Sequence, residues 1–159
     1  MKRIWAPWRI EYIQSDCADK ECFLCKSLSE SDDRKNLLLK RSDCCGVIMN
    51  RYPYNNGHLL VFPYRHVGCV SELNPEERLR MMDIISETVE ILRDKMRPEG
   101  FNIGYNLGKT AGAGLEDHIH AHIVPRWNGD TNFMPVLGDL RIIPQSLEDL
   151  YDQIAGEFS

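Results

Sequence analysis

The chain has 159 residues, of which 43% are apolar and 27% charged, which is the size and composition of one globular domain. A collagenous, low-complexity or wholly disordered chain is excluded, and no apolar run approaches the roughly 20 residues of a membrane span. The net charge of −5 argues against a nucleic-acid partner, because steering onto a phosphate backbone needs a basic face. The amino end has no long apolar core, so we expect a cytoplasmic protein without a secretory signal.

The chain is predicted to be a single domain with an amino-terminal arm (residues 1–35), a core (36–124) and a carboxyl-terminal tail (125–159). Turn-forming residues separate the first three predicted strands, which are Asn36 to Lys40, Cys45 to Asn50 and His58 to Pro63. Pro63 should end the third strand, because proline has no N–H to donate to a sheet.

A long helix is predicted from Pro75 to Met96. Asn74 suits the N-cap and Pro75 the first helical position, whereas Pro98 and Gly100 should stop the helix. Apolar residues recur at steps of three and four, which predicts one stripe packed against a sheet: Leu79, Met82, Ile85, Val89, Leu92 and Met96.

Two more strands are predicted after this helix, at Phe101 to Leu107 and at His118 to Val124, joined by the glycine-rich segment GKTAGAG. A short helix should begin near Ser146. Strand pairs with one long helix across them predict an α+β domain, with an antiparallel sheet, the long helix packed on it and a short C-terminal helix.

Three of the five histidines stand at alternate positions of the last predicted strand, at His118, His120 and His122. Alternate side chains project from one face of a strand, so these imidazoles should line a cleft. Ile119, Ala121 and Ile123 would then point into the core. On a helix the same histidines would scatter around the axis.

The residues alone leave three interpretations of this row open. It can be an exposed polar strand face, a metal site, since imidazole is a common zinc ligand, or a centre for chemistry on phosphate. A neutral imidazole is a competent nucleophile, and an ordinary histidine pKa of about 6.5 leaves the ring mostly neutral at pH 7. The GKTAGAG segment could offer backbone N–H groups to a phosphate, and Lys109 a positive charge.

Several segments resemble one family. The triad segment HIHAHIV, followed by PRW, is similar to the signature of the histidine triad (HIT) family of nucleotidyl hydrolases and transferases. The segment NRYPYNNGHLLVFPYRHV resembles that family's strand with an upstream Asn before a Gly–His pair, and CFLC resembles its amino-terminal Cys-x-x-Cys. The resemblance covers about Cys22 to Val124. WAPWR and PRWNGDTNFMPV resemble the branch that contains diadenosine tetraphosphate phosphorylases.

The resemblance implies a role for each histidine of the site. His120 would attack the α-phosphorus and carry a covalent nucleotidyl group. His122, with His118 as a further candidate, would hydrogen-bond phosphate oxygens or orient the ring, and His58 would contact the phosphate region. Substrate contacts are expected at Asn50 (the ribose), Asn106, Lys109, Gly112 and Gly114. Residues 114–117 depart from the Ser or Gln segment of other branches, which leaves protonation of the leaving group open.

Cys22 and Cys25 have the two-residue gap that lets two thiolates reach one zinc ion. Metal-free thiols and a redox pair are the alternatives. The resemblance implies that His66 and His118 complete a structural site, and Cys69 is an alternative to His66.

The predicted function is cleavage of dinucleoside polyphosphates or nucleoside phosphoramidates at the α-phosphorus. Water, or inorganic phosphate in a phosphorylase, would resolve the covalent intermediate. Magnesium could accompany such a substrate. The resemblance also implies a homodimer. The alternatives are a nucleotide-binding sensor with little turnover and a zinc-dependent hydrolase with the metal on the triad.

Overall fold

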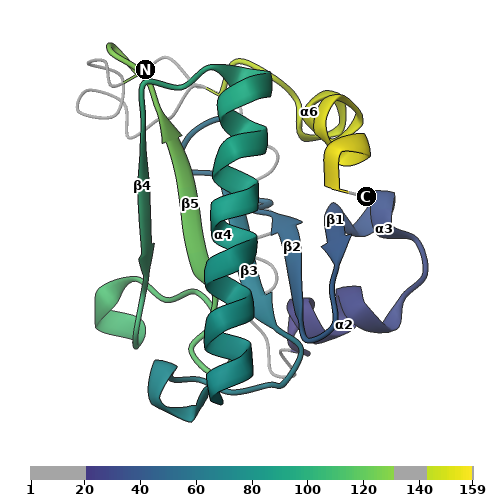
Figure 1. Ribbon diagram of the computed structural model, residues 1–159, viewed down its shortest axis with the longest axis vertical. Coiled ribbons are helices and arrows are strands. Elements are labelled where there is room, and N and C mark those ends of the chain that lie inside the picture. Colours follow the sequence, from purple (N-terminus) through teal and green to yellow (C-terminus); the bar gives the residue numbers. More distant parts are fainter. Residues whose placement is uncertain (1–20, 131–142, 159) are drawn as a thin grey trace, which may run out of the picture.

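The computed structural model describes residues 21–130 and 143–158 and confirms an antiparallel α+β domain (Figure 1). Five strands form one sheet in the order β1-β2-β3-β5-β4, and all neighbouring strands are antiparallel. The strands are β1 (Leu38–Arg41), β2 (Cys45–Met49), β3 (Leu59–Pro63), β4 (Gly100–Tyr105) and β5 (Ala121–Arg126). The WAPWR motif and residues 131–136 of the PRWNGDTNFMPV motif lie outside the described residues.

The long helix α4 (Pro75–Met96) has the bounds predicted from its sequence. The Asn74 side chain accepts a hydrogen bond from the Glu77 backbone N–H at 2.8 Å, and the Glu77 carboxylate accepts one from the Asn74 N–H at 2.9 Å. This capping box satisfies two N–H groups that the first turn leaves without a helical partner. Arg97, in the left-handed conformation, ends the helix.

Shorter helices flank the sheet. The C-terminal helix expected to begin near Ser146 is present as α6. The bounds are α2 (Phe23–Ser29), α3 (Asp33–Asn36), α6 (Leu147–Ile154) and the 3₁₀ helices η1 (Val70–Glu72), η2 (Lys109–Ala111) and η3 (Ala155–Phe158). Of the helices described, none is both long and apolar enough to span a membrane.

The two faces of the sheet carry separate apolar clusters. α4 lies across one face (Figure 1), and the α4 cluster there includes Val47, Val61 and Ile123. On the opposite face, Leu24 of α2 packs with Leu60 and other residues in the α2 cluster. Strand residues that are adjacent in sequence thus face opposite clusters, as the two-residue period of a strand requires.

The stripe that α4 buries differs in part from the predicted one. Its buried residues are Glu77, Met81, Ile84, Ile85, Thr88 and Leu92. The prediction was right for Ile85 and Leu92 but wrong for Leu79 and Met82, which are 65% and 58% exposed. Glu77 takes an inward position because Arg65 pairs with its carboxylate at 2.7 Å. Apolar periodicity alone could not give the phase of a helix that buries polar side chains.

Candidate active site and metal centre

The pairing of β3 with β5 brings the histidines together. His122 lies opposite Leu60 on the sheet face away from α4, and His58 immediately precedes β3. His58 Nε2 lies 2.9 Å from His122 Nδ1. The ring centroids of His120 and His122 are 4.9 Å apart. Three of the four histidines predicted to be catalytic thus form one contiguous group.

The strand that carries this group is shorter at its start than predicted. β5 begins at Ala121, so the prediction of a strand from His118 was wrong there. Continuing the β3–β5 register would set Ile119 opposite Pro63, which has no N–H to donate. The Pro63 carbonyl instead accepts a hydrogen bond from His118 Nε2 at 2.8 Å. Ile119 and Ala121 still pack in the α4 cluster, as predicted.

A hydrogen bond at Nδ1 of His120 leaves the other ring nitrogen, Nε2, unprotonated. Its Nδ1 lies 2.8 Å from the carbonyl oxygen of His118. A carbonyl oxygen can only accept, so the proton is assigned to Nδ1. Burial lowers the pKa of His120 from its ordinary value, although this hydrogen bond acts in the opposite direction. The ring is therefore neutral at pH 7, with an electron pair at Nε2 that can act as a nucleophile.

His122 has a buried nitrogen with no partner. Burial, followed by repulsion from His120, lowers the pKa of His122 to about 4, so the ring is neutral at pH 7. Its Nδ1 is bonded to His58, whereas its Nε2 has no hydrogen-bond partner in the part of the chain that the structure describes. Such an atom is costly to bury, and a substrate oxygen would satisfy it.

The RYPYNNG turn surrounds His58. The Tyr54 backbone N lies 3.0 Å from His58 Nδ1, and Asn50 Nδ2 lies 3.2 Å from the same atom. The Tyr54 ring stacks on the His122 ring, with centroids 5.7 Å apart and planes at 18°. Its hydroxyl accepts a hydrogen bond from Asn106 Nδ2 at 3.5 Å. Asn50 and Asn106, both predicted to contact substrate, therefore lie beside the histidines.

The remaining predicted substrate residues lie on the exposed loop around η2. Gly112 has φ +89°, and a Cβ there would lie 3.8 Å from Asn106 Nδ2, so this part of the loop borders the site. Contacts of Lys109 and Gly114 with a substrate stay predictions. Tyr54 was missed by the sequence reasoning. Its position four residues before His58 in a turn was the available signal.

The four predicted metal ligands converge. The ligand atoms of Cys22, Cys25, His66 and His118 all lie within 4.8 Å of one another. Cys22 Sγ lies 3.2 Å from His118 Nδ1, and Cys25 Sγ lies 3.4 Å from His66 Nδ1. Because His118 donates through Nε2 to Pro63, its Nδ1 faces the sulfur atoms with an electron pair. Two thiolates and two imidazoles are a donor set typical of structural zinc.

The thiol chemistry of the cluster also fits a bound cation. Burial and the neighbouring Cys22 raise the pKa of Cys25 to about 11, so its thiol would stay protonated without a nearby positive charge. A bound zinc ion stabilises thiolates directly. Cys69 does not belong to the convergent group, and the alternative in which it replaces His66 was wrong.

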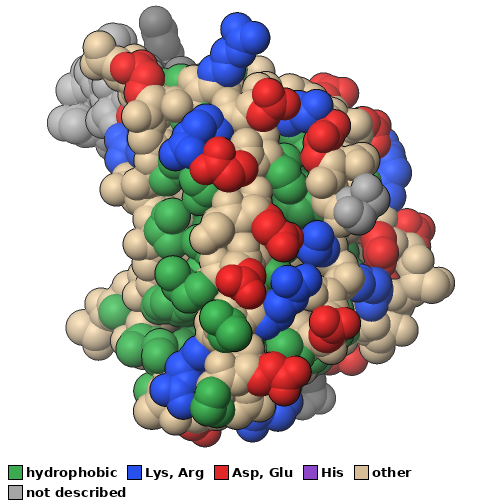
Figure 2. All heavy atoms as spheres, in the orientation of Figure 1, with side chains coloured by type: hydrophobic (Ala, Val, Ile, Leu, Met, Phe, Trp, Pro, Cys, Tyr) green, Lys and Arg blue, Asp and Glu red, His purple; other side chains and the backbone are tan. Residues whose placement is uncertain are grey.

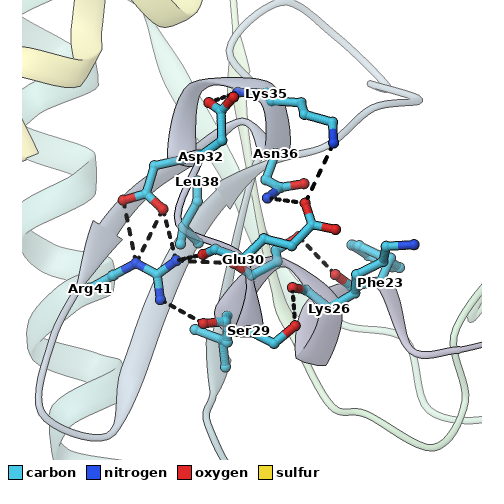
Figure 3. A network of polar contacts seen from close by, with 12 residues as sticks. Phe23, Lys26, Ser29, Glu30, Asp32, Lys35, Asn36, Leu38 and Arg41 are labelled. Atoms are coloured by element: carbon cyan, nitrogen blue, oxygen red, sulfur yellow. Dashed lines mark hydrogen bonds and ion pairs between the residues drawn. The ribbon is translucent and has the colours of Figure 1, made fainter.

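Arg41 fixes the helix that carries Cys25. From the end of β1, its guanidinium donates to the backbone carbonyls of Ser27, Leu28 and Glu30 at 2.8–3.1 Å, and it also pairs with Asp33 at 2.8 Å. Figure 3 shows Arg41 pointing into this group. Carbonyls at the end of a helix lack helical partners, so these bonds hold the carboxyl end of α2 against the sheet edge.

The geometry argues against a metal on the triad. Such a site would need the nitrogens of His118, His120 and His122 to converge. His118 Nδ1 faces the cysteines, and the Nδ1 atoms of the other two histidines are engaged by a carbonyl and by His58. Within residues 21–130 and 143–158, the Cys/His cluster is the one group of three or more potential ligands that converges.

Comparison with known proteins places these features in a family context. The model of the HIT domain matches residues 32–129. The chain is 34% identical to an AP-4-A phosphorylase of Mycobacterium tuberculosis over 168 aligned positions, covering 100% of this chain and 85% of the relative. It is 26% identical to adenosine 5'-monophosphoramidase hnt1 of Schizosaccharomyces pombe, over 66% of this chain and 75% of that protein.

Among solved structures, a zinc-bound histidine triad family protein from Mycobacterium smegmatis has a similar fold. Its TM-score is 0.68 at 25% sequence identity, and the alignment covers 87% of this chain and 93% of that one. The alignment with the AP-4-A phosphorylase covers 100% of this chain, so that alignment includes both the histidine group and the segment that carries the cysteines.

Proposed function

The chain belongs to the HIT-domain family, and from this membership we propose that it cleaves a nucleotide at the α-phosphorus with His120 as the nucleophile. The observation that carries the proposal is the ring of His120, which is neutral and holds its proton at Nδ1, so that Nε2 offers an electron pair. The Nε2 of His122, which has no partner among the described residues, would supply a hydrogen-bond donor for phosphate oxygens; the centroids of the His120 and His122 rings are 4.9 Å apart.

The reaction proceeds in two displacements. His120 Nε2 forms a bond to the α-phosphorus as the bond from phosphorus to the leaving group breaks, and the leaving group departs with that electron pair. Water or inorganic phosphate then attacks the same phosphorus and displaces His120 with its electron pair restored. Water yields a nucleoside monophosphate and gives up a proton, whereas phosphate yields a nucleoside diphosphate.

We propose dinucleoside polyphosphates as the substrate class, with nucleoside phosphoramidates as the second class. Similarity to an AP-4-A phosphorylase along the whole chain supports the first, and similarity to a monophosphoramidase supports the second. In either class the leaving group lies beyond the α-phosphorus, so both suit the same nucleophile. Asn50, Asn106, Lys109, Gly112 and Gly114 are the proposed substrate contacts. Magnesium would belong to a polyphosphate substrate, and no residue is assigned to it.

We propose that zinc binds to Cys22, Cys25, His66 and His118 in a structural role. The convergence of two sulfur and two nitrogen ligands supports this assignment, as does the similarity to a zinc-bound family member. Zinc would fix the position of His118, whose carbonyl orients His120. Bound zinc would stabilise the local fold and would not take part in the reaction, because four protein ligands leave no open coordination position for substrate.

We further propose that the protein is a homodimer formed along β4. Five exposed apolar side chains lie on α4, on β4 and just after β4. We call this surface the β4 patch, and its residues are Leu79, Met82, Ile103, Tyr105 and Leu107. Figure 2 shows hydrophobic side chains gathered over this side of the molecule, between β4 and the flank of α4. Among the strands described, β4 lies at one edge of the sheet, and a second copy related by two-fold symmetry would pair with that edge and cover the patch.

Trapping of the covalent intermediate tests the proposed function. Wild-type protein mixed with diadenosine tetraphosphate and quenched with denaturant should gain the mass of one adenylyl group, located on His120. His120→Asn should not, because asparagine can still donate to the His118 carbonyl but has no atom equivalent to Nε2. Cys69→Ser, outside the site, should form the adduct as the wild type does.

Two results would contradict the proposal. Turnover by His120→Asn at the wild-type rate would exclude this nucleophile. Binding of nucleotide by the wild type without cleavage of any polyphosphate or phosphoramidate would identify a sensor instead. Adding phosphate or omitting it decides between phosphorolysis and hydrolysis, through release of ADP or AMP.

A further inference from the structure

His58 has both ring nitrogens engaged inside the protein. It is 2% exposed, and its Nδ1 lies 3.0 Å from the backbone N of Tyr54. A backbone N–H can only donate, so Nδ1 of His58 must be the acceptor and cannot carry a proton. Asn50 Nδ2 lies near the same nitrogen, and the Asn50 Oδ1 accepts from the Tyr52 N–H at 2.9 Å, which fixes the amide in that orientation.

The assignment at Nδ1 determines the rest of the chain of hydrogen bonds. An imidazole without a proton at Nδ1 has its proton at Nε2, and this group donates to His122 Nδ1 at 2.9 Å. His122 then accepts at Nδ1, so its own proton must lie at Nε2. That nitrogen is the buried atom for which the described residues provide no partner.

We propose that His58 is a positioning residue that sets the tautomer of His122, and that it does not bind the phosphate itself. This inference deepens the proposed function and rests on it for the identity of the ligand, a phosphate oxygen of the nucleotide. The backbone amide of Tyr54 fixes His58, and His58 makes His122 present an N–H group at Nε2. The opposite tautomer would aim an electron pair at the negatively charged oxygen and repel it.

The Tyr54 ring adds a second constraint. It packs against both rings, with centroids 4.6 Å from His58 and 5.7 Å from His122. One residue of the turn therefore holds His58 through its backbone and the His58–His122 pair through its side chain. This explains how a turn, rather than a strand, can determine the proton position of a histidine in β5.

Nitrogen NMR of histidine side chains in the ligand-free, zinc-loaded protein tests the proposal directly. We expect the proton at Nε2 in both His58 and His122, with a scalar coupling across the hydrogen bond between His58 Nε2 and His122 Nδ1. Titration with AMP should shift His122 Nε2 while that coupling persists. A proton on Nδ1 of His122, or loss of the coupling when AMP binds, would overturn the proposal.

A matched pair of variants adds a kinetic readout. His58→Gln places an amide N–H near the position of Nε2, whereas His58→Met has a similar length and no donor. We expect kcat to fall by less than about tenfold in His58→Gln and by about 100-fold in His58→Met, the effect of losing one oriented donor. His122 should keep one tautomer in the first variant and show two in the second. Equal losses would contradict the proposal.

The outcomes separate this inference from the proposed function. Asn56→Ala serves as the control, because Asn56 lies in the same turn and its amide contacts Gln145 rather than a histidine. It should retain the wild-type tautomers. If these tautomers are present but no adduct forms on His120, the proposed function fails while the role of His58 stands. If the adduct forms but His122 carries its proton at Nδ1, the inferred role of His58 fails while the proposed function stands.

Discussion

At the scale of single residues, the site depends on where each histidine keeps its proton. His120 and His118 each donate to a backbone carbonyl, and His58 accepts from a backbone N–H. These partners have fixed roles, so three imidazoles with the same intrinsic chemistry become three different groups. In the proposed roles, His120 would offer an electron pair to substrate, His118 would offer one to zinc, and His58 would set the tautomer of His122.

A prediction at this scale concerns the pH dependence of stability. The pKa of His122 falls from about 6.5 in the unfolded chain to about 4 in the folded protein, so between these values the unfolded state binds more protons. The free energy of unfolding should therefore be highest above pH 7, fall as the pH drops from about 6.5 to 4, and level off below.

The test compares wild type with His122→Asn, which keeps an acceptor for His58 but cannot titrate. Between pH 7 and 4, the wild type should lose more stability than the variant, by an amount on the order of 3 kcal/mol. Denaturant unfolding at each pH measures the difference, and excess zinc in both samples keeps the metal site comparable. Parallel stability curves would show that His122 is not the neutral group inferred here.

At the scale of elements, α2 is a short helix held at both ends. A helix of 7 residues has little stability of its own, because nucleation is costly. Arg41 bonds to the carbonyls at its carboxyl end, and Cys22 and Cys25 tie its amino end to the proposed metal site. Leu24 adds packing in the α2 cluster. A zinc ion bound there would therefore have a local structural role, whereas the proposed chemistry takes place at His120.

We expect that zinc removal lowers the melting temperature far more than it lowers catalysis by the protein that remains folded. A strong chelator, or Cys25→Ser, should reduce the melting temperature by several degrees and speed amide exchange at residues 22–26. Cys69→Ser should have neither effect, because Cys69 is outside the cluster. A chelated protein that stays folded with unchanged melting but loses all turnover would show that the metal is catalytic.

At the scale of the whole molecule, the two edges of the sheet differ. β1 is bordered by α3 and η3, which cover part of that side (Figure 1), whereas β4 borders the exposed β4 patch. Strands at the edge of a sheet can pair with a strand of another chain. Ile103 and Tyr105 lie beside Ile123 and Ala121 on the face that carries α4, so pairing through β4 would extend the α4 face across both copies.

Sedimentation analysis tests this arrangement. The wild type should sediment as a dimer at micromolar concentration, and Ile103→Glu should shift it toward the monomer, because a carboxylate would lose its hydration in the interface. Phe23→Glu is the matched control, since Phe23 is 44% exposed on α2 and outside the β4 patch. A monomeric wild type, or equal dissociation by both variants, would contradict dimerisation through β4.

The sequence alone determined the elements whose signals are local. The cap at Asn74 and the stops after Met96 gave the bounds of α4, and the two-residue period placed Ile119, Ala121 and Ile123 in the core. Residue spacing and family resemblance also identified the four side chains that converge in the Cys/His cluster. Short-range sterics and hydrogen bonding fix these features, so a linear pattern records them.

Only the tertiary structure decided the features that depend on partners distant in the chain. Packing against the sheet decided which face α4 buries, and the hydrogen bond from the Ile119 N–H to the Val67 carbonyl lies outside the β3–β5 ladder, which begins at Ala121. Tyr54 became part of the site because its turn folds over His122. A proton position follows from the group that lies opposite a nitrogen in space, and no sequence pattern specifies that group.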